Sequence, residues 1–281
     1  MGDSAAKGVR FSRQEHNAIG MFDRYRQAFA AVRRSYPPEK AQEEARTEIA
    51  AFVLYRPLSF VLTPFFLWAG CSADAVTALG GLLAGGMIVA ALAAGPYACG
   101  TVVALGIFIQ ILDCVDGNIA RVTGRSSPVG GLLDGLCTLL FWVFYFCAVG
   151  VLAGADAGGW AGRHGREIGL ALAALMLAQR AMEDSSVQCL PERVRWEPPV
   201  PAVLPRFNLK RLAKLLEHVI AFGGLGAAGA LHAVPLFLAG LAAYQLTVLA
   251  LWWPRFARAV YLRSRTRSQI RDDRREREDA E

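Results

Sequence analysis

The stretch QILDCVDGNIARVTGRSSPVGGLLDGLCTLL, residues 110–140, decides how this chain folds. Apolar runs flank it on both sides, and its middle is a turn rich in Gly, Ser and Pro. Acidic residues stand where each apolar run meets the turn: Asp113 and Asp116 before it and Asp134 after it. The pattern predicts two antiparallel helices joined by a short turn, with three carboxylates brought to one depth.

Apolar residues dominate far beyond this hairpin. Of the 281 residues, 54% are hydrophobic and 19% are charged, and the mean hydropathy is +0.32. A bilayer core requires about 20 mainly apolar residues per helix, and several nearly uncharged runs reach that length. A soluble all-helical domain would need several helices that are apolar on every face, which is unusual outside membranes and the cores of larger proteins. We predict an all-α polytopic membrane protein with six spans, at residues 74–95, 98–119, 130–153, 166–183, 212–231 and 234–254.

The segment before the first predicted span has a different character. Residues 52–69 are apolar, but Arg56, Pro57 and Pro64 interrupt them. This composition favours an amphipathic helix that lies in the membrane interface. We divide the chain into a polar extension (1–51), a membrane domain (52–255) and a basic, mixed-charge tail (256–281).

Basic residues gather on one side of this topology. Lys and Arg are frequent in residues 180–214, in the tail and in the 120–127 turn, whereas the opposite loops hold few. The positive-inside rule therefore places both termini and the Asp-bearing turn in the cytoplasm, at the cell membrane. The net charge of +6 comes largely from these flanks, so we expect contact with lipid headgroups and not with nucleic acid.

The three acids indicate a functional site, because ionisable groups at membrane depth are energetically costly and are functional candidates by default. Residues three apart share a helix face, which aligns Asp113 with Asp116. Asp134 opens the next helix on the same side. Without a matching lysine cluster, converging carboxylates favour a hard divalent cation, Mg²⁺ or Mn²⁺. The small residues Gly117 and Gly130 would leave room for a phosphate-bearing ligand.

Two other interpretations of the acids stay open at this point: a structural polar network and an ion-coupled transporter. A transporter predicts further acids along a pathway toward the far side of the membrane. The apolar segments 136–155 and 219–254 contain none, and Glu217 lies just before the latter.

Read in full, the motif is D-x2-D-G-x2-A-R-x8-G-x3-D, formed by Asp113, Asp116, Gly117, Ala120, Arg121, Gly130 and Asp134. It resembles the signature of the CDP-alcohol phosphotransferases, also called CDP-alcohol phosphatidyltransferases, over about residues 52–255. The resemblance implies a membrane enzyme of phospholipid biosynthesis, and a homodimer. Such an enzyme moves a substituted phosphate group from a CDP-alcohol, such as CDP-diacylglycerol, to an acceptor hydroxyl and releases CMP.

The resemblance also implies roles for individual positions. The three acids would hold one or two Mg²⁺ or Mn²⁺ ions on the diphosphate of the donor. Gly117 and Ala120 would let the cytidine moiety approach, Arg121 would bind or orient the diphosphate, and Gly130 would leave space for substrate.

Thr138 departs from the family pattern, which has a further Asp at this place, usually read as the general base and a possible metal ligand. A threonine hydroxyl is not a competent base near neutral pH. The base could be another acid, such as Glu183 or Asp184, or the acceptor could be unusually acidic or carry its own phosphate. The chain could also be a degenerate member that binds nucleotide or a partner without turnover. We expect an active enzyme, because the three acids and the Gly/Ala/Arg frame are intact.

Overall fold

The computed structural model describes residues 20–93, 95–126, 128–156, 159–189 and 218–278, and this part of the chain contains helices and no strand. The prediction of an all-α fold is confirmed. The helices are α1 (Met21–Ser35), α2 (Pro38–Thr47), the π-helical turn η2 (Ala51–Tyr55), α3 (Arg56–Trp68), α4 (Ala73–Leu92), α5 (Ala98–Thr123), α6 (Pro128–Ala155), α7 (Gly159–Arg163), α8 (Gly165–Cys189), the π-helical turn η4 (Val219–Gly224), α10 (Leu225–Ala230) and α11 (Val234–Glu278).

The predicted hairpin consists of α5 and α6, and local sequence explains its turn. Helix α5 ends at Gly124, whose φ of 65° lies in the left-handed region that glycine adopts without strain. Helix α6 begins at Pro128, a residue suited to a first helical position. The acids therefore lie in the last turns of one helix and the first turns of the next.

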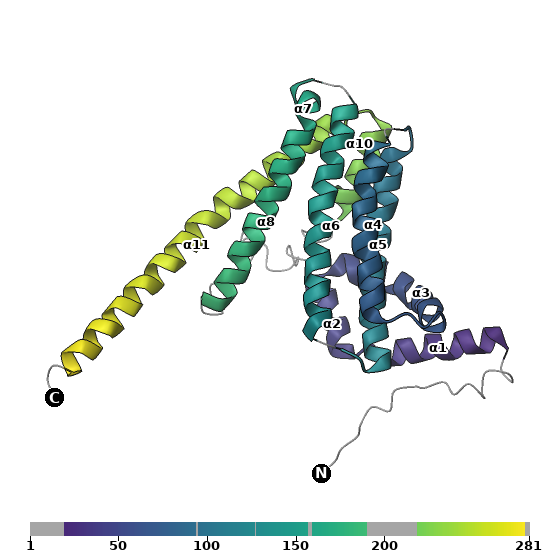
Figure 1. Cartoon of the computed structure of the whole chain (residues 1–281), viewed down its shortest axis with the longest axis horizontal. Coiled ribbons are helices and arrows are strands. Elements are labelled where there is room, and N and C mark those ends of the chain that lie inside the picture. The colour runs from purple at the N-terminus through teal and green to yellow at the C-terminus, as the bar shows by residue number, and fades with distance from the viewer. Residues whose placement is uncertain (1–19, 94, 127, 157–158, 190–217, 279–281) are drawn as a thin grey trace, which may run out of the picture.

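Helices α4, α5 and α6 form the centre of the molecule and run side by side (Figure 1). Their facing sides bury large apolar side chains, including Met87, Val102, Phe141 and Tyr145. Phe222 of η4 packs into the same cluster. This tightly packed core gives the functional side chains a rigid base.

Helix α8 packs against α6 through glycines. A Cβ atom added at Gly150 would lie 2.5 Å from the carbonyl oxygen of Gly165 and 2.9 Å from the Cα of Gly169. The two backbones are therefore in direct contact, as small residues permit between membrane helices.

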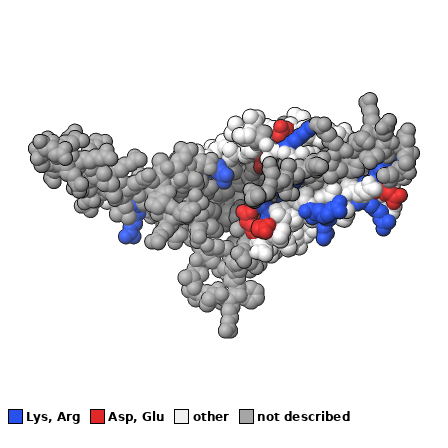
Figure 2. All heavy atoms as spheres, turned by 90° about the horizontal axis from the view of Figure 1, so that it is seen from below, with Lys and Arg blue, Asp and Glu red and all other residues white. Residues whose placement is uncertain are grey.

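Helices α1, α2 and α3 gather at the end of the bundle where α5 turns into α6 (Figure 1). Viewed from below, this end presents basic and acidic side chains together (Figure 2). A polar end of this kind belongs outside the apolar layer of a membrane.

Five helical segments are long and apolar enough to cross a membrane: Ala51–Trp68, Ala73–Leu92, Ala98–Thr123, Pro128–Ala155 and Val234–Arg258. The chain is a multi-pass membrane protein. Four of these segments match predicted spans. The fifth, Ala51–Trp68, contains the helix predicted to lie in the membrane interface. By length and composition it could also span, since η2 and α3 continue into one another across Pro57 and Pro64 without a break.

The count of six spans is not confirmed. Helix α8 is long, but it contains charged residues, among them Arg166, Glu167 and Arg180, and it is not one of the five segments apolar enough to span. In place of the span predicted at 212–231, the structure describes a 12-residue apolar stretch, Val219–Ala230, and residues 212–217 lie outside the described residues. Helix α11 runs past the predicted span end into the basic tail.

Candidate active site

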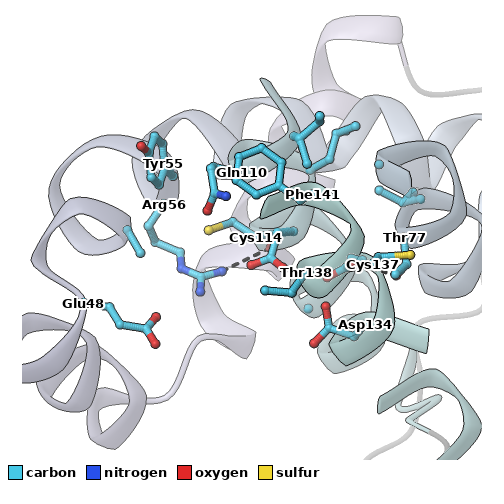
Figure 3. Close-up of a pocket in the computed structure, with 18 of the residues that line it drawn as sticks. Glu48, Tyr55, Arg56, Thr77, Gln110, Cys114, Asp134, Cys137, Thr138 and Phe141 are labelled. Carbon is cyan, nitrogen blue, oxygen red and sulfur yellow. Dashed lines mark hydrogen bonds between the residues drawn. The ribbon is translucent and has the colours of Figure 1, made fainter. Parts of the chain in front are cut away.

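A cavity of about 570 Å³ opens at the polar end of the bundle (Figure 3). Its walls come from α2, η2, α3, α4, α5 and α6, with Arg180 of α8 and His218 completing them. Six of the residues singled out from the sequence line it: Asp113, Asp116, Gly117, Arg121, Asp134 and Thr138. Ala120 and Gly130 are not among the lining residues.

The three acids meet at this cavity but differ in their surroundings. Asp113 and Asp134 are exposed and line the cavity from α5 and α6. Asp116 is 8% exposed and accepts a hydrogen bond from Thr77 Oγ1 at 2.6 Å. Thr77 lies on α4, and no local motif pointed to it.

Within the described residues, no three His, Cys, Asp or Glu side chains are arranged to hold a metal ion by themselves. Asp113 and Asp116 from α5 and Asp134 from α6 nevertheless line the same cavity. Proteins commonly bind Mg²⁺ through one or two carboxylates together with substrate phosphates and water, without an all-protein cage. This donor set fits a divalent cation bound jointly with a phosphate ligand.

Arg56 is the centre of a buried polar network beside the acids. Its Nε donates to Glu44 Oε2 at 3.0 Å, and its Nη2 donates to Glu44 Oε1. Its Nη1 donates to the carbonyl oxygen of Cys114 at 3.1 Å and to Asn118 Oδ1 at 3.2 Å. One side chain of α3 therefore ties α2 to the acid-bearing part of α5.

Asn118 extends the network toward the motif arginine. Its Nδ2 donates to Ser59 Oγ and Thr63 Oγ1, both at 3.0 Å. Its Oδ1 accepts from Arg56 and, at 2.7 Å, from Nη2 of Arg121. Asn118 is fully buried, so its hydrogen bonds fix the amide and, through it, the Arg121 guanidinium.

Arg121 folds back along α5 over Gly117. A Cβ atom at Gly117 would lie 3.3 Å from Arg121 Nη1, so the glycine leaves room for the guanidinium. The buried Nε of Arg121 has no hydrogen-bond partner among the described residues. A buried donor without a partner costs about 1–3 kcal/mol, and a phosphate oxygen could satisfy it.

Tyr36, between α1 and α2, completes the network. Its hydroxyl donates to Glu44 Oε2 at 2.7 Å, and its ring lies under the guanidinium groups of Arg56 and Arg121, at 5.1 and 5.8 Å. Burial and the bond to Glu44 raise the pKa of Tyr36, which keeps the phenol protonated. Burial alone would raise the pKa of Glu44, but the hydrogen bonds from Arg56 and Tyr36 hold it below its usual value, so Glu44 is charged at neutral pH.

Thr138 lies on the same helix as Asp134 and lines the cavity (Figure 3). It presents a hydroxyl where the family has a carboxylate. Glu183 and Asp184, the alternative acids considered from the sequence, lie on α8, but their side chains fall outside the described residues. The cavity contains two acids that sequence reasoning missed: Glu44 on α2, and Glu48, which follows α2. Neither has a motif around it.

Comparison with known proteins agrees with the motif. The family model for CDP-alcohol phosphatidyltransferase matches residues 70–254. A phosphatidylinositol phosphate synthase from Streptomyces avermitilis is 33% identical over 144 residues, a match that covers 43% of this chain and 57% of that relative's length. No solved structure gives a significant match. Since the family model covers more than half of the chain, the protein belongs to the CDP-alcohol phosphatidyltransferase family.

Proposed function

We propose that the protein is an integral-membrane phosphotransferase of phospholipid biosynthesis. It moves a substituted phosphate group from a CDP-alcohol to an acceptor hydroxyl and releases CMP. The observation that carries the proposal is that one cavity at the polar end of the bundle is lined by four residues of the family motif: Asp113, Asp116, Asp134 and Arg121. Family membership supports the same reaction.

The relative's name concerns phosphatidylinositol phosphate, so we propose CDP-diacylglycerol as donor and an inositol phosphate as acceptor. Basic side chains that line the cavity, Lys40, Arg121 and Arg180, suit an anionic acceptor as well as the donor diphosphate. The cavity would face the cytoplasm at the cell membrane, as the arginine distribution predicts. The assembly would be a homodimer.

The carboxylates of Asp113, Asp116 and Asp134 would hold Mg²⁺ or Mn²⁺, which neutralises charge on the diphosphate and favours departure of CMP. Thr77 keeps Asp116 oriented. Asn118 holds Arg121 so that its remaining donors can bind diphosphate oxygens. Positioning of this kind supplies much of the rate in phosphoryl transfer.

The test is CMP release by the purified full-length chain in detergent, with CDP-diacylglycerol, MgCl₂ and inositol phosphate, inositol or glycerol phosphate as acceptor. We expect turnover that EDTA abolishes and that falls to background in Asp134→Asn. Asp74→Asn is the matched control, because Asp74 is an exposed acid on α4 that does not line the cavity. Full turnover in Asp134→Asn would place the chemistry elsewhere.

Thr138 supports a second candidate, a degenerate member that binds nucleotide without transfer. Its signature would be CDP-diacylglycerol binding that depends on Mg²⁺ and on Asp134, with no CMP release for any acceptor.

A further inference from the structure

The cavity lacks the carboxylate expected at position 138, yet it is rich in other acids. Five carboxylate side chains line it: Glu44, Glu48, Asp113, Asp116 and Asp134. Any of these that is not already engaged could take over the role of the missing residue.

Four of the five already have a structural or a proposed role. Glu44 is 1% exposed and binds Arg56 and Tyr36. Asp116 accepts from Thr77, and Asp113, Asp116 and Asp134 are the motif acids that would hold the cation in the proposed function. Among the described lining residues, this leaves Glu48 as the carboxylate without an assigned role.

Glu48 differs from the other four. It is exposed to the cavity, and within the described residues its carboxylate has no hydrogen bond or ion pair. Figure 3 shows it on the Arg56 side of the cavity, opposite Asp134 and Thr138. Glu48 and the motif acid Asp113 line the same cavity.

The backbone at Glu48 is held in place. Its N–H donates to the carbonyl oxygen of Glu44 at 2.8 Å, and its own carbonyl accepts from the N–H of Phe52 at 3.0 Å. The first bond attaches Glu48 to the end of α2, which the Glu44–Arg56 ion pair anchors to α3. A free carboxylate on an anchored backbone is suited to general-base work.

We propose that Glu48 is the general base of this enzyme and replaces the carboxylate that Thr138 lacks. This inference rests on the proposed function. The acceptor hydroxyl gives its proton to a carboxylate oxygen of Glu48, and the hydroxyl oxygen forms a bond to the β-phosphorus of the CDP-alcohol. The bond from that phosphorus to the oxygen bridging to the α-phosphate breaks, CMP leaves with the electron pair, and Glu48 releases the proton to water.

Glu48 precedes the family-matched region, which begins at residue 70. The segment from α2 to α3 therefore supplies a functional group of the reaction, in addition to closing the cavity. The sequence motif alone could not show this, because the missing acid is replaced from a segment 90 residues away along the chain (48 against 138).

The test compares CMP release by wild type, Glu48→Gln, Thr138→Asp and the double variant, with CDP-diacylglycerol, Mg²⁺ and inositol phosphate. Loss of a general base typically costs about 10²–10⁴-fold, so we expect kcat of Glu48→Gln to fall by that factor with little change in the KM for the donor. Adding Thr138→Asp to Glu48→Gln should recover part of the loss, because a carboxylate returns to the family's position. Glu39→Gln is the matched control, since Glu39 is an exposed acid on α2 that does not line the cavity.

Several outcomes would overturn the inference while leaving the proposed function intact. The first is full CMP release by Glu48→Gln when Asp134→Asn is inactive. The second is loss of CMP release in Glu183→Gln or Asp184→Asn but not in Glu48→Gln. The third is a loss in Glu48→Gln that adding Thr138→Asp does not relieve. An inactive wild type that gains CMP release with Thr138→Asp alone would show a degenerate member and overturn it as well. Activity retained in Asp134→Asn would instead contradict the proposed function.

Discussion

Asp116 shows why a single residue on another helix can control a motif acid. A buried carboxylate must be hydrogen-bonded, because desolvation otherwise makes its charge very costly. Thr77 Oγ1 donates at 2.6 Å, within the range of charge-assisted O–H···O⁻ bonds. The bond holds Asp116 at the cavity wall, so Thr77 would act as a positioning residue for the proposed metal site.

We predict that Thr77→Val weakens metal binding. Groups that support metal ligands typically contribute about 10–100-fold in affinity, so the Mg²⁺ concentration for half-maximal CMP release should rise by about that factor. Mg²⁺ titrations of the variant and of Thr101→Val measure it. Thr101 is the control, because its hydroxyl donates only to a backbone carbonyl on an exposed face of α5. An unchanged Mg²⁺ requirement in Thr77→Val would show that Asp116 needs no such support.

At the scale of elements, the Glu44–Arg56 ion pair joins α2, α3 and α5. Glu44 and Arg56 are 1% and 7% exposed, so each charge depends on the other for compensation. Tyr36 also donates to Glu44, and Arg56 also donates to Cys114 and Asn118. Removing one partner of such a buried pair leaves the other charge uncompensated. The pair therefore holds the segment that carries Glu48 against the motif helix.

We predict that Glu44→Gln destabilises the protein at pH 7 by about 3–5 kcal/mol. The folded-state pKa of Glu44 lies below its ordinary value of 4.5, so its stabilising contribution is present above that pH and is lost as the pH falls below it. Thermal unfolding in detergent should show a large difference from wild type at pH 7 that shrinks in acid. The exposed Lys40–Glu43 pair provides the control, and Glu43→Gln should cost about 0–1 kcal/mol. A difference that does not change with pH would mean that the charge of Glu44 is unimportant.

The whole molecule is polarised along the bundle. The α5–α6 turn, α1, α2 and the cavity lie at one end, whereas the α4–α5 connection and the α10–α11 connection lie at the other (Figure 1). A membrane around the apolar helices would separate the two ends. The charged donor diphosphate would reach the cavity from the first end.

We predict that this first end is cytoplasmic. In a background with the native cysteines replaced, a membrane-impermeant maleimide added to intact cells should label Gly95→Cys and His232→Cys, which lie in the connections at the far end. Arg26→Cys and Arg258→Cys should react only after the cells are opened. Labelling of Arg26→Cys in intact cells would reverse the orientation.

The all-α class, the α5–α6 hairpin and the positions of Asp113, Asp116 and Asp134 near its turn could all be predicted from the sequence. These features depend on signals close together in the chain, such as apolar runs, helix periodicity, Gly124 and Pro128, and on a motif with fixed spacing. Hydropathy could not decide between interfacial and spanning helices, because Ala51–Trp68 and α8 are intermediate in composition. The span count was therefore the least secure part of the prediction.

The residues that complete the cavity could not be predicted from the sequence, because they come from distant segments of the chain. Thr77 lies 39 residues from Asp116, Arg56 lies 62 residues from Asn118, and Glu48 reaches the cavity from a helix end with no motif around it. Such partners are chosen by helix packing, which brings together side chains that no local pattern relates. A buried carboxylate requires a hydrogen-bond donor, and the sequence does not show which distant residue supplies it.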